Sequence, residues 1–174
     1  MEYVFTLKYR LTEDDRDHER IVERLGEAGC DDALVGIGVP GRIALEFARE
    51  ADNAQDAVRT ALADVDRAVP SAHLIEAAPD LVGLTEIAET VGVSRQNMRK
   101  LMLTHANSFP APMHAGNPSI WHLAEVLGWL DMRGGYDLDP ALQEVARVTM
   151  EVNLVKEARR VAPETARSLG RLIA

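Results

Sequence analysis

A cluster of side chains between residues 95 and 100 can donate hydrogen bonds outward from a helix: Arg95, Gln96, Asn97, Arg99 and Lys100. Guanidinium, amide and ammonium groups suit the recognition of polar or anionic surfaces. The chain has a net charge of −9, but its acidity is unevenly distributed. Residues 1–80 hold 9 Lys/Arg and 18 Asp/Glu, whereas residues 81–135 hold 4 of each. A polyanion can therefore approach the middle of the chain while the acidic part faces away.

The residues around this cluster have the spacing of two helices joined by a tight turn. Gly92 ends the first helix, because glycine adopts a left-handed backbone at low cost. Ser94 is suited to cap the second helix. The small core between the helices is expected to take apolar residues from both helices and from the turn: Ile87, Ala88, Val91, Val93, Met98 and Leu101.

This pattern resembles the helix-turn-helix family of DNA-binding proteins. In that family the second helix enters the major groove, and residues early on its exposed face reach base edges. The resemblance implies base contacts by Arg, Gln and Asn, which pair with guanine or adenine edges, and a phosphate contact by Lys100. The residues expected to bind DNA on this helix are Ser94, Arg95, Gln96, Asn97, Arg99 and Lys100. The alternative is an ordinary helical hairpin with a solvated basic face.

The segment after the second helix is typical of a β-hairpin wing followed by a helix. Its expected parts are a strand, a Gly/Asn/Pro-rich tip, a returning strand and a helix: Ser108–Met113, His114–Pro118, Ser119–Trp121 and His122–Met132. Residues 81–132 together resemble the winged domains of the MerR and phage-excisionase group. The resemblance implies that the wing lies along the DNA backbone or minor groove, with contacts from His114, Asn117 and Ser119. This chain departs from the group because its wing holds no Arg or Lys, which predicts weaker or conditional wing contacts.

The first 79 residues alternate between strand and helix periodicity. We expect four strands, at Glu2–Leu11, Ala33–Ile37, Arg42–Arg49 and Ala72–Ala77. We expect two helices between them, at Glu13–Ala28 after the first strand and at Ala54–Ala68 after the third. This βαββαβ order predicts a ferredoxin-like domain over residues 1–79. The sheet face without helices must be solvated, or covered by a partner or another domain.

The rest of the chain is predicted to be mainly helical, which gives an α+β protein. The boundary at Pro79-Asp80 leaves a winged helix-turn-helix domain at residues 80–135 and a C-terminal helical segment at residues 136–174. Apolar residues recur every three to four positions through Pro140–Val161, and Glu164–Ile173 is expected to form a short helix. The long apolar stripe either completes the intramolecular core or pairs two chains. A homodimer fits, because paired recognition helices read paired half-sites.

Other residues that can do chemistry lack the spacing that a catalytic or metal site requires. The five histidines show no paired metal spacing, and no nucleophile–base pair is evident. Residues 36–41 lack the Gly-Lys-Ser/Thr ending of a phosphate loop and are expected to form a hairpin turn. Cys30 is expected to be a small buried residue, and the acidic run 13–17 to supply helix-cap charges. We therefore expect no enzyme, no metal and no cofactor.

The resemblance leaves two hypotheses for the function, and composition adds an expectation for the location. The chain has no stretch of 18 apolar residues, no signal-peptide block and a single cysteine, so that we expect no membrane association and a cytoplasmic location. The first hypothesis is a bacterial-type transcription regulator, a repressor that binds double-stranded DNA as a homodimer, with an N-terminal domain that senses a small-molecule ligand or partner. The alternative is an antitoxin that grips a toxin-like protein and represses its own operon through the winged domain.

Overall fold

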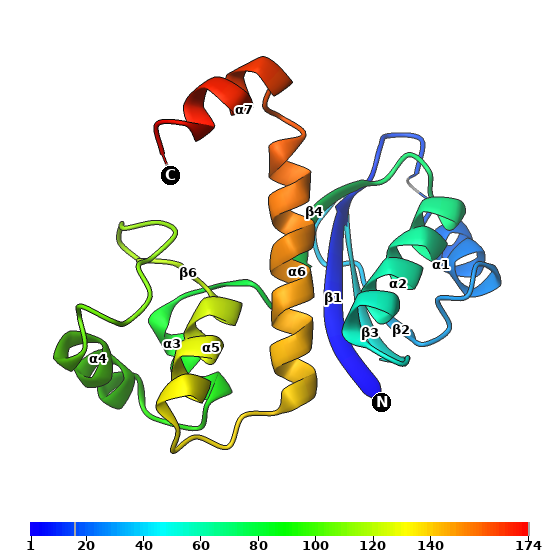
Figure 1. The fold of residues 1–174 in the computed structure, drawn as a ribbon. Helices are drawn as coiled ribbons and strands as arrows, with labels where there is room; N and C mark the ends of the chain where they lie inside the picture. Colours follow the sequence, from blue (N-terminus) through cyan, green and yellow to red (C-terminus); the bar gives the residue numbers. More distant parts are fainter. Residues whose placement is uncertain (16, 174) are drawn as a thin grey trace.

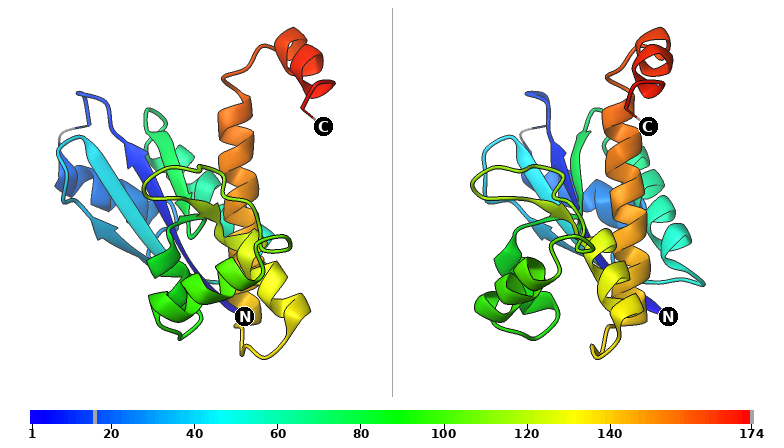
Figure 2. Two further views of the ribbon diagram at one scale, coloured as in Figure 1. Left: turned by 90° about the vertical axis from the view of Figure 1, so that its left-hand side faces the viewer. Right: turned by 60° about the vertical axis from the view of Figure 1, so that its left-hand side comes forward.

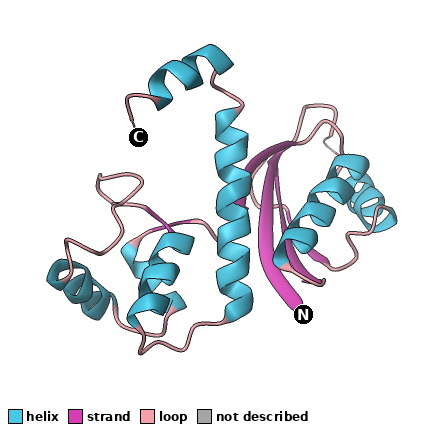
Figure 3. Cartoon of the chain, in the orientation of Figure 1, coloured by secondary structure: helices cyan, strands magenta, loops and turns pink. Residues whose placement is uncertain are grey.

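A long helix, α6 (Pro140–Ala158), stands between a helix-covered sheet and a smaller group of helices in the computed structural model, which describes residues 1–15 and 17–173 (Figure 1). Two further views show that the last helix, α7 (Pro163–Gly170), projects beyond both groups at the end of α6 (Figure 2). The described residues form a four-stranded antiparallel sheet, a small two-stranded sheet and the helices around them (Figure 3). The expected α+β class is confirmed. No helix in these described ranges is long and apolar enough to cross a membrane.

The four-stranded sheet comprises β1 (Glu2–Arg10), β2 (Ala33–Gly36), β3 (Arg42–Glu50) and β4 (His73–Ala78). Its order is β2-β3-β1-β4, and every neighbouring pair is antiparallel. Strand alternation turns one face inward, where apolar side chains of β1 and β3 form a core with α1 (His18–Glu27) and α2 (Ala54–Ala68). The opposite face carries mainly polar or small residues and is largely exposed.

The first helix is shorter than the sequence predicts, since it begins at His18 rather than Glu13. Asp17 is its N-cap, and the Asp17 side chain accepts a hydrogen bond from the Arg20 amide. Asp15 lies before the helix and accepts hydrogen bonds from the Thr12 hydroxyl at 3.2 Å and the Arg24 guanidinium at 3.1 Å. The acidic run therefore supplies a cap and a loop anchor instead of a first helical turn.

Asp15 also predicts a pH-dependent contribution to stability. Hydrogen bonds lower the pKa of its carboxyl, above all the one from the Ser71 hydroxyl. Because the folded-state pKa lies below the unfolded one, the carboxylate stabilises the fold above the ordinary value of 3.8, and this contribution disappears as the pH falls through the lowered folded value. We expect Asp15→Asn to cost about 1 kcal/mol of unfolding free energy at pH 7 and much less at pH 3, measured by urea unfolding. A cost that stays constant with pH would exclude the carboxylate charge as its source.

Two sequence features that resemble chemical motifs have structural roles. Gly36 ends β2 and Arg42 begins β3, and the two strands pair antiparallel, so that the glycine-rich stretch is a hairpin connection, as expected. Gly41 in this connection has a φ of +72°, which favours glycine. Cys30 is 3% exposed within the first core, as expected. Burial raises the pKa of its thiol to about 11, so the thiol stays protonated at neutral pH.

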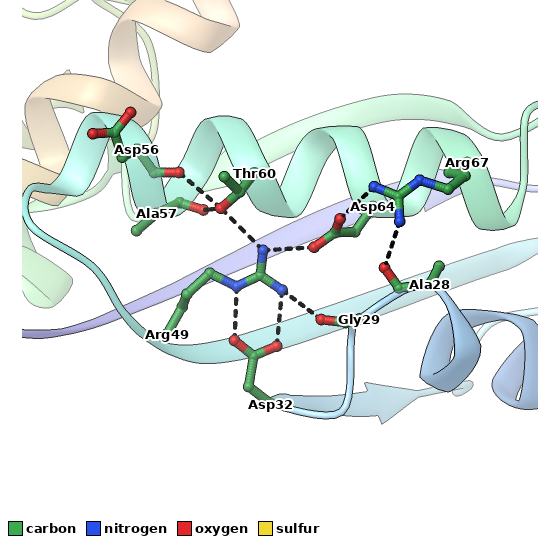
Figure 4. Close-up of polar contacts among 9 residues, drawn as sticks. All are labelled: Ala28, Gly29, Asp32, Arg49, Asp56, Ala57, Thr60, Asp64 and Arg67. Atoms are coloured by element: carbon green, nitrogen blue, oxygen red, sulfur yellow. Dashed lines mark hydrogen bonds and ion pairs between the residues drawn. The ribbon is translucent and has the colours of Figure 1, made fainter.

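Arg49 occupies the inward-facing side of β3, where periodicity predicts an apolar residue (Figure 4). It is 8% exposed, and all five of its N–H donors are used. Asp32 accepts two of them at 2.7 and 3.0 Å, and Asp64 accepts one at 2.8 Å. The remaining two go to the Thr60 hydroxyl and the Gly29 carbonyl. A single guanidinium thus ties β3 to α2 and to the turn before β2.

The smaller group of helices has its own core and a two-stranded sheet. Its elements are β5 (Leu81–Val82), α3 (Leu84–Thr90), α4 (Arg95–Thr104), β6 (Trp121–His122) and α5 (Leu123–Arg133). Strand β5 was not expected, and it pairs with β6. The strand predicted over Ser108–Met113 does not form, because Pro110 and Pro112 have no amide hydrogens to give to a ladder. The returning strand is correspondingly short, and Trp121 pairs with Val82 instead.

Helix α6 (Pro140–Ala158) contributes to both cores. Asp139 caps it, and Pro140 occupies its first turn. Val145 and Val148 belong to the core of the four-stranded sheet, whereas Ala146 on the other side belongs to the core of the smaller group. The helix ends three residues before the expected Val161, and α7 (Pro163–Gly170) follows. The expected stripe therefore packs within the chain over the first part of α6.

Buried polar groups join α6 to the edge of the sheet. The Asn153 amide accepts from the Ala77 N–H at 2.9 Å and donates to the Ala77 carbonyl at 2.7 Å. It also donates to Asp80 at 2.7 Å, and Asp80 bonds His122 Nδ1 at 2.7 Å. The N–H and carbonyl of Ala77 on the edge strand β4 are therefore satisfied by a side chain, which hinders pairing of this edge with another chain at that position.

Candidate nucleic-acid interface

Local backbone geometry fixes the angle between α3 and α4. The Glu86 carboxylate accepts from the Gly83 N–H at 2.6 Å and so satisfies the start of α3. Gly92 follows that helix with a φ of +72°. The Ser94 side chain accepts from the Asn97 N–H at 3.1 Å and caps α4, as predicted. Each residue that sets the turn therefore acts through its expected backbone role.

The apolar residues of both helices lie in the core as the spacing predicts. Ile87 and Met98 are 0% exposed, and Ala88 is 1% exposed. The other three expected core residues are partly buried against the same cluster: Val91, Val93 and Leu101. This packing holds α4 against α3 and fixes which side of α4 faces outward.

The expected donor cluster lies on the outward side of α4. All five of its residues are exposed: Arg95, Gln96, Asn97, Arg99 and Lys100. Within the described residues, none of these side chains forms a hydrogen bond or ion pair with the rest of the chain. Since α4 has no acidic residue, its three cations give it a formal charge of +3. The surface has unused donors and unneutralised charge.

Helical geometry orders these residues by how directly they face outward. At about 100° per residue, Gln96 and Lys100 lie about 160° from the buried Met98. Arg99 and Asn97 lie about 100° from it on either side, and Arg95 about 60°. Leu103 lies on the same outward side and is 58% exposed. Leu103 is not among the residues predicted for this face, although its spacing from Lys100 and Arg99 places it there. An exposed apolar side chain there has the chemistry to contact a thymine methyl group.

The wing candidate is a compact loop closed by one bridge. His114 and Ile120 exchange two backbone hydrogen bonds, at 3.2 and 3.0 Å. His114 and Asn117 are exposed, whereas Ser119 is partly buried and donates its hydroxyl to the Gly116 carbonyl at 3.0 Å. A Cβ at Gly116 would lie 2.1 Å from His114 Nε2, so the loop brings these residues into close contact. His114 and Asn117 are available to a partner, but Ser119 already uses its donor within the loop.

Aromatic packing attaches the base of this loop to α5. Phe109 contacts Trp121 edge-to-face at 6.3 Å and Trp129 at 5.1 Å between ring centroids. The Trp121 indole N–H donates to the Pro110 carbonyl at 3.0 Å. The expected strand positions therefore hold the loop through side chains rather than through a ladder.

Helix α4 and the loop both lie on the side of the molecule away from α6 (Figures 1 and 2). The sheet and its two helices, formed by residues of the acidic segment 1–80, lie on the other side of α6. A polyanion at α4 therefore meets the cationic helix before the acidic part of the chain.

This surface offers hydrogen-bond donors and cations on one face of a single helix. Among residues 1–15 and 17–173 there is no group of three or more His, Cys, Asp or Glu side chains that could hold a metal ion. No family model, no curated protein and no solved structure matches this chain.

Proposed function

We propose that this protein binds double-stranded DNA through a winged helix-turn-helix, with α4 in the major groove. One observation carries the proposal: α4 presents five donor side chains without partners in the described residues and a charge of +3, on a helix held by a core centred on the buried Ile87 and Met98. Arg, Gln and Asn are the side chains that pair with guanine and adenine edges, and Lys suits phosphate. The alternative, an ordinary helical hairpin with a solvated face, does not explain why five unpaired donors gather on one helix.

The other parts of the chain support a regulator of transcription. The strand order β2-β3-β1-β4 with antiparallel pairing supports a ferredoxin-like arrangement for the first part of the chain, which has its own core beside the proposed DNA-binding part. We propose that the protein acts as a homodimer and represses transcription. Exposed apolar residues on the last two helices, and Leu172 just after α7, support dimerisation: Leu154, Val155, Leu169 and Leu172. His114 and Asn117 are the proposed wing contacts.

Selection of bound fragments from sheared genomic DNA tests this function. We expect enrichment of fragments that share one sequence. If a dimer binds, this sequence should contain two half-sites whose centres are about 34 Å, or a multiple of that distance, apart. Binding should weaken as salt is added, because phosphate contacts release counterions. Absence of enrichment, or an affinity that salt does not change, would rule out DNA as the partner.

Arg95→Ala and Arg99→Ala are expected to weaken binding to the selected DNA by about 1–3 kcal/mol each, that is, roughly 5- to 150-fold. Each substitution removes a donor pair for a base edge without touching the core, so the fold is unaffected. Gel-shift titration measures the loss. Arg20→Ala is the matched control, because Arg20 is an exposed arginine of α1 on the other side of α6. Equal affinities for all three variants would refute the assignment of α4 as the reading helix.

A further inference from the structure

A groove runs between α2 and α6 on the helix-covered side of the sheet. Its volume is about 610 Å³. Apolar side chains of the two helices form its floor and walls: Val58, Leu62, Val65, Val148, Val152 and Val155. Val155 is 59% exposed, and Leu62 and Val152 are half-buried. The groove is therefore an apolar surface that the described chain leaves open.

The rim of this groove carries charges of both signs. Its lining contains three cations and two carboxylates: Arg59, Lys156, Arg159, Asp66 and Glu151. Because these charges nearly cancel, the rim favours neither a strongly anionic nor a strongly cationic partner. An apolar centre with a mixed polar rim is the usual anatomy of a protein–protein contact. The lining therefore fits the apolar face of a protein segment.

Helix α7 carries apolar residues that nothing in the described chain covers. Leu169 is 50% exposed, and Leu172 and Ile173, which follow the helix, are 78% and 81% exposed. At about 100° per residue, Glu164 and Arg167 lie about 140° and 160° from Leu169 around the helix. None of the eight residues of α7, all of which the structure describes, is buried. The helix is therefore amphipathic, but its apolar side has no packing surface.

A helix as short as α7 depends on such a surface. Isolated helices of fewer than about 12–15 residues are marginal in water, and the helices of folded proteins are stabilised mainly by packing of their apolar side. Helix α7 comprises only Pro163–Gly170. A stable α7 therefore requires an apolar surface that covers Leu169.

The connection between α6 and α7 directs α7 away from the groove of its own chain. Backbone hydrogen bonds hold this connection: the Arg160 N–H donates to the Glu157 carbonyl at 3.0 Å, and the Val161 N–H donates to the Ala158 carbonyl at 3.1 Å. Ala162 is extended, as a residue before proline prefers. Helix α7 leads to the side of α6 on which the smaller group of helices lies, whereas α2 lies on the other side (Figure 1). The groove is thus open to the α7 of another copy.

We propose that α7 of one copy docks in the groove between α2 and α6 of a second copy, and that the second copy docks its α7 in return. At 1.5 Å per residue, the groove follows α6 from Val148 to Arg159 over about 16 Å, and α7 is about 12 Å long, so the helix fits. Leu169 then lies against the apolar floor, and the charged side of α7 faces solvent.

The short distance along the chain between groove and helix favours a closed dimer. Arg159 lines the groove, and α7 begins at Pro163, only four residues later. One two-fold axis near the end of α6 therefore permits both contacts at once, and reciprocal contacts close the assembly at two copies. This inference names the contact of the homodimer proposed above and rests on that part of the proposed function, but it does not depend on DNA binding.

Sedimentation equilibrium of the full chain tests this contact, and we expect the parent chain to dimerise. Leu169→Asp in α7 and Val155→Asp in the groove wall are each expected to raise the dimer dissociation constant at least about 100-fold, which is ten-fold for each of the two equivalent contacts. Both residues are exposed in the single chain, so neither substitution disturbs a core. Leu103→Asp is the matched control, because Leu103 is an exposed leucine of α4, and this variant should dimerise as the parent chain does.

A mixture of the two variants distinguishes exchange of α7 from other dimers. In the mixed dimer, α7 of the Val155→Asp chain meets the intact groove of the Leu169→Asp chain, so one of the two contacts is restored. The mixture is therefore expected to associate about ten-fold more tightly than either variant alone. A monomeric parent chain, or a dimer that either substitution leaves intact, would overturn the docking. A mixture that associates no better than the single variants would also overturn it, because the two residues would then not face each other.

DNA titration of the same variants keeps this inference distinct from the proposed function. Arg95→Ala and Arg99→Ala change α4 alone and should leave the dimer intact. A dimer that responds to the substitutions and to mixing as expected, but binds no DNA, would overturn the proposed function and leave the docking in place. Sequence-specific DNA binding by a chain that stays monomeric would overturn the docking and leave the role of α4 in place.

Discussion

Arg49→Met is expected to lower the free energy of unfolding by about 3 kcal/mol. Methionine retains an unbranched apolar body in the space where the guanidinium lies 5.0 Å over the Phe47 ring. It donates no hydrogen bond, so the carboxylates of Asp32 and Asp64 lose their shared cation and the Gly29 carbonyl loses its donor. The side chains of Asp32 and Asp64 are 28% and 16% exposed, so water can partly solvate them. The expected loss of unfolding free energy is therefore at the lower end of the range for breaking a buried ion pair.

Urea unfolding followed by far-ultraviolet circular dichroism measures this cost. Arg67→Met is the matched control, because Arg67 also bonds Asp64 but its side chain is 64% exposed. We expect less than about 1 kcal/mol for the control. Similar losses for the two variants would mean that burial of the guanidinium is not what makes the Arg49 network strong.

Asn153→Ala is expected to cost about 2–4 kcal/mol and to loosen the attachment of α6 to β4. The substitution leaves the N–H and carbonyl of Ala77 without partners and removes a donor from Asp80, whose side chain is 0% exposed. Water must then reach these groups, or they stay buried and unsatisfied. Both outcomes destabilise the junction between the sheet and the smaller core.

Hydrogen exchange separates the local effect from the global one. The Ala77 amide is expected to exchange faster in Asn153→Ala by more than the change in global stability explains, because its own acceptor is gone. Arg147→Ala is the control on the same helix, since Arg147 is exposed and its side chain has no partner in the described residues. An Ala77 amide that stays as protected as in the parent chain would contradict the role assigned to Asn153.

The donor face of α4 could be predicted because every interaction that forms it is local. Ile87, Gly92 and Met98 lie within twelve residues, and helical spacing alone decides which side chains face the core. The strands of the first sheet were predicted for the same reason, since alternation marks their inner faces. Leu103 was not predicted on this face because an exposed leucine carries no polar signal, although the same spacing assigns it to the exposed side.

Contacts between distant segments could not be predicted from local spacing in the sequence. Trp121 pairs with Val82, and Asn153 binds Ala77 across 76 positions, so no local pattern connects either pair. The position of Arg49 could be recognised in the sequence, because strand alternation puts it on the same face as the apolar Ile43, Leu45 and Phe47. The sequence could not reveal that Asp32 and Asp64 lie within reach of it.

Because α6 packs in both cores, it limits which fragments of this protein can fold by themselves. Val145 and Val148 complete one core and Ala146 the other, within four successive positions of one helix. A fragment that ends after α5 would leave the inner faces of both halves uncovered, and neither half could be transplanted to another protein without taking the helix along. The two halves are therefore expected to behave as one cooperative unit rather than as interchangeable modules.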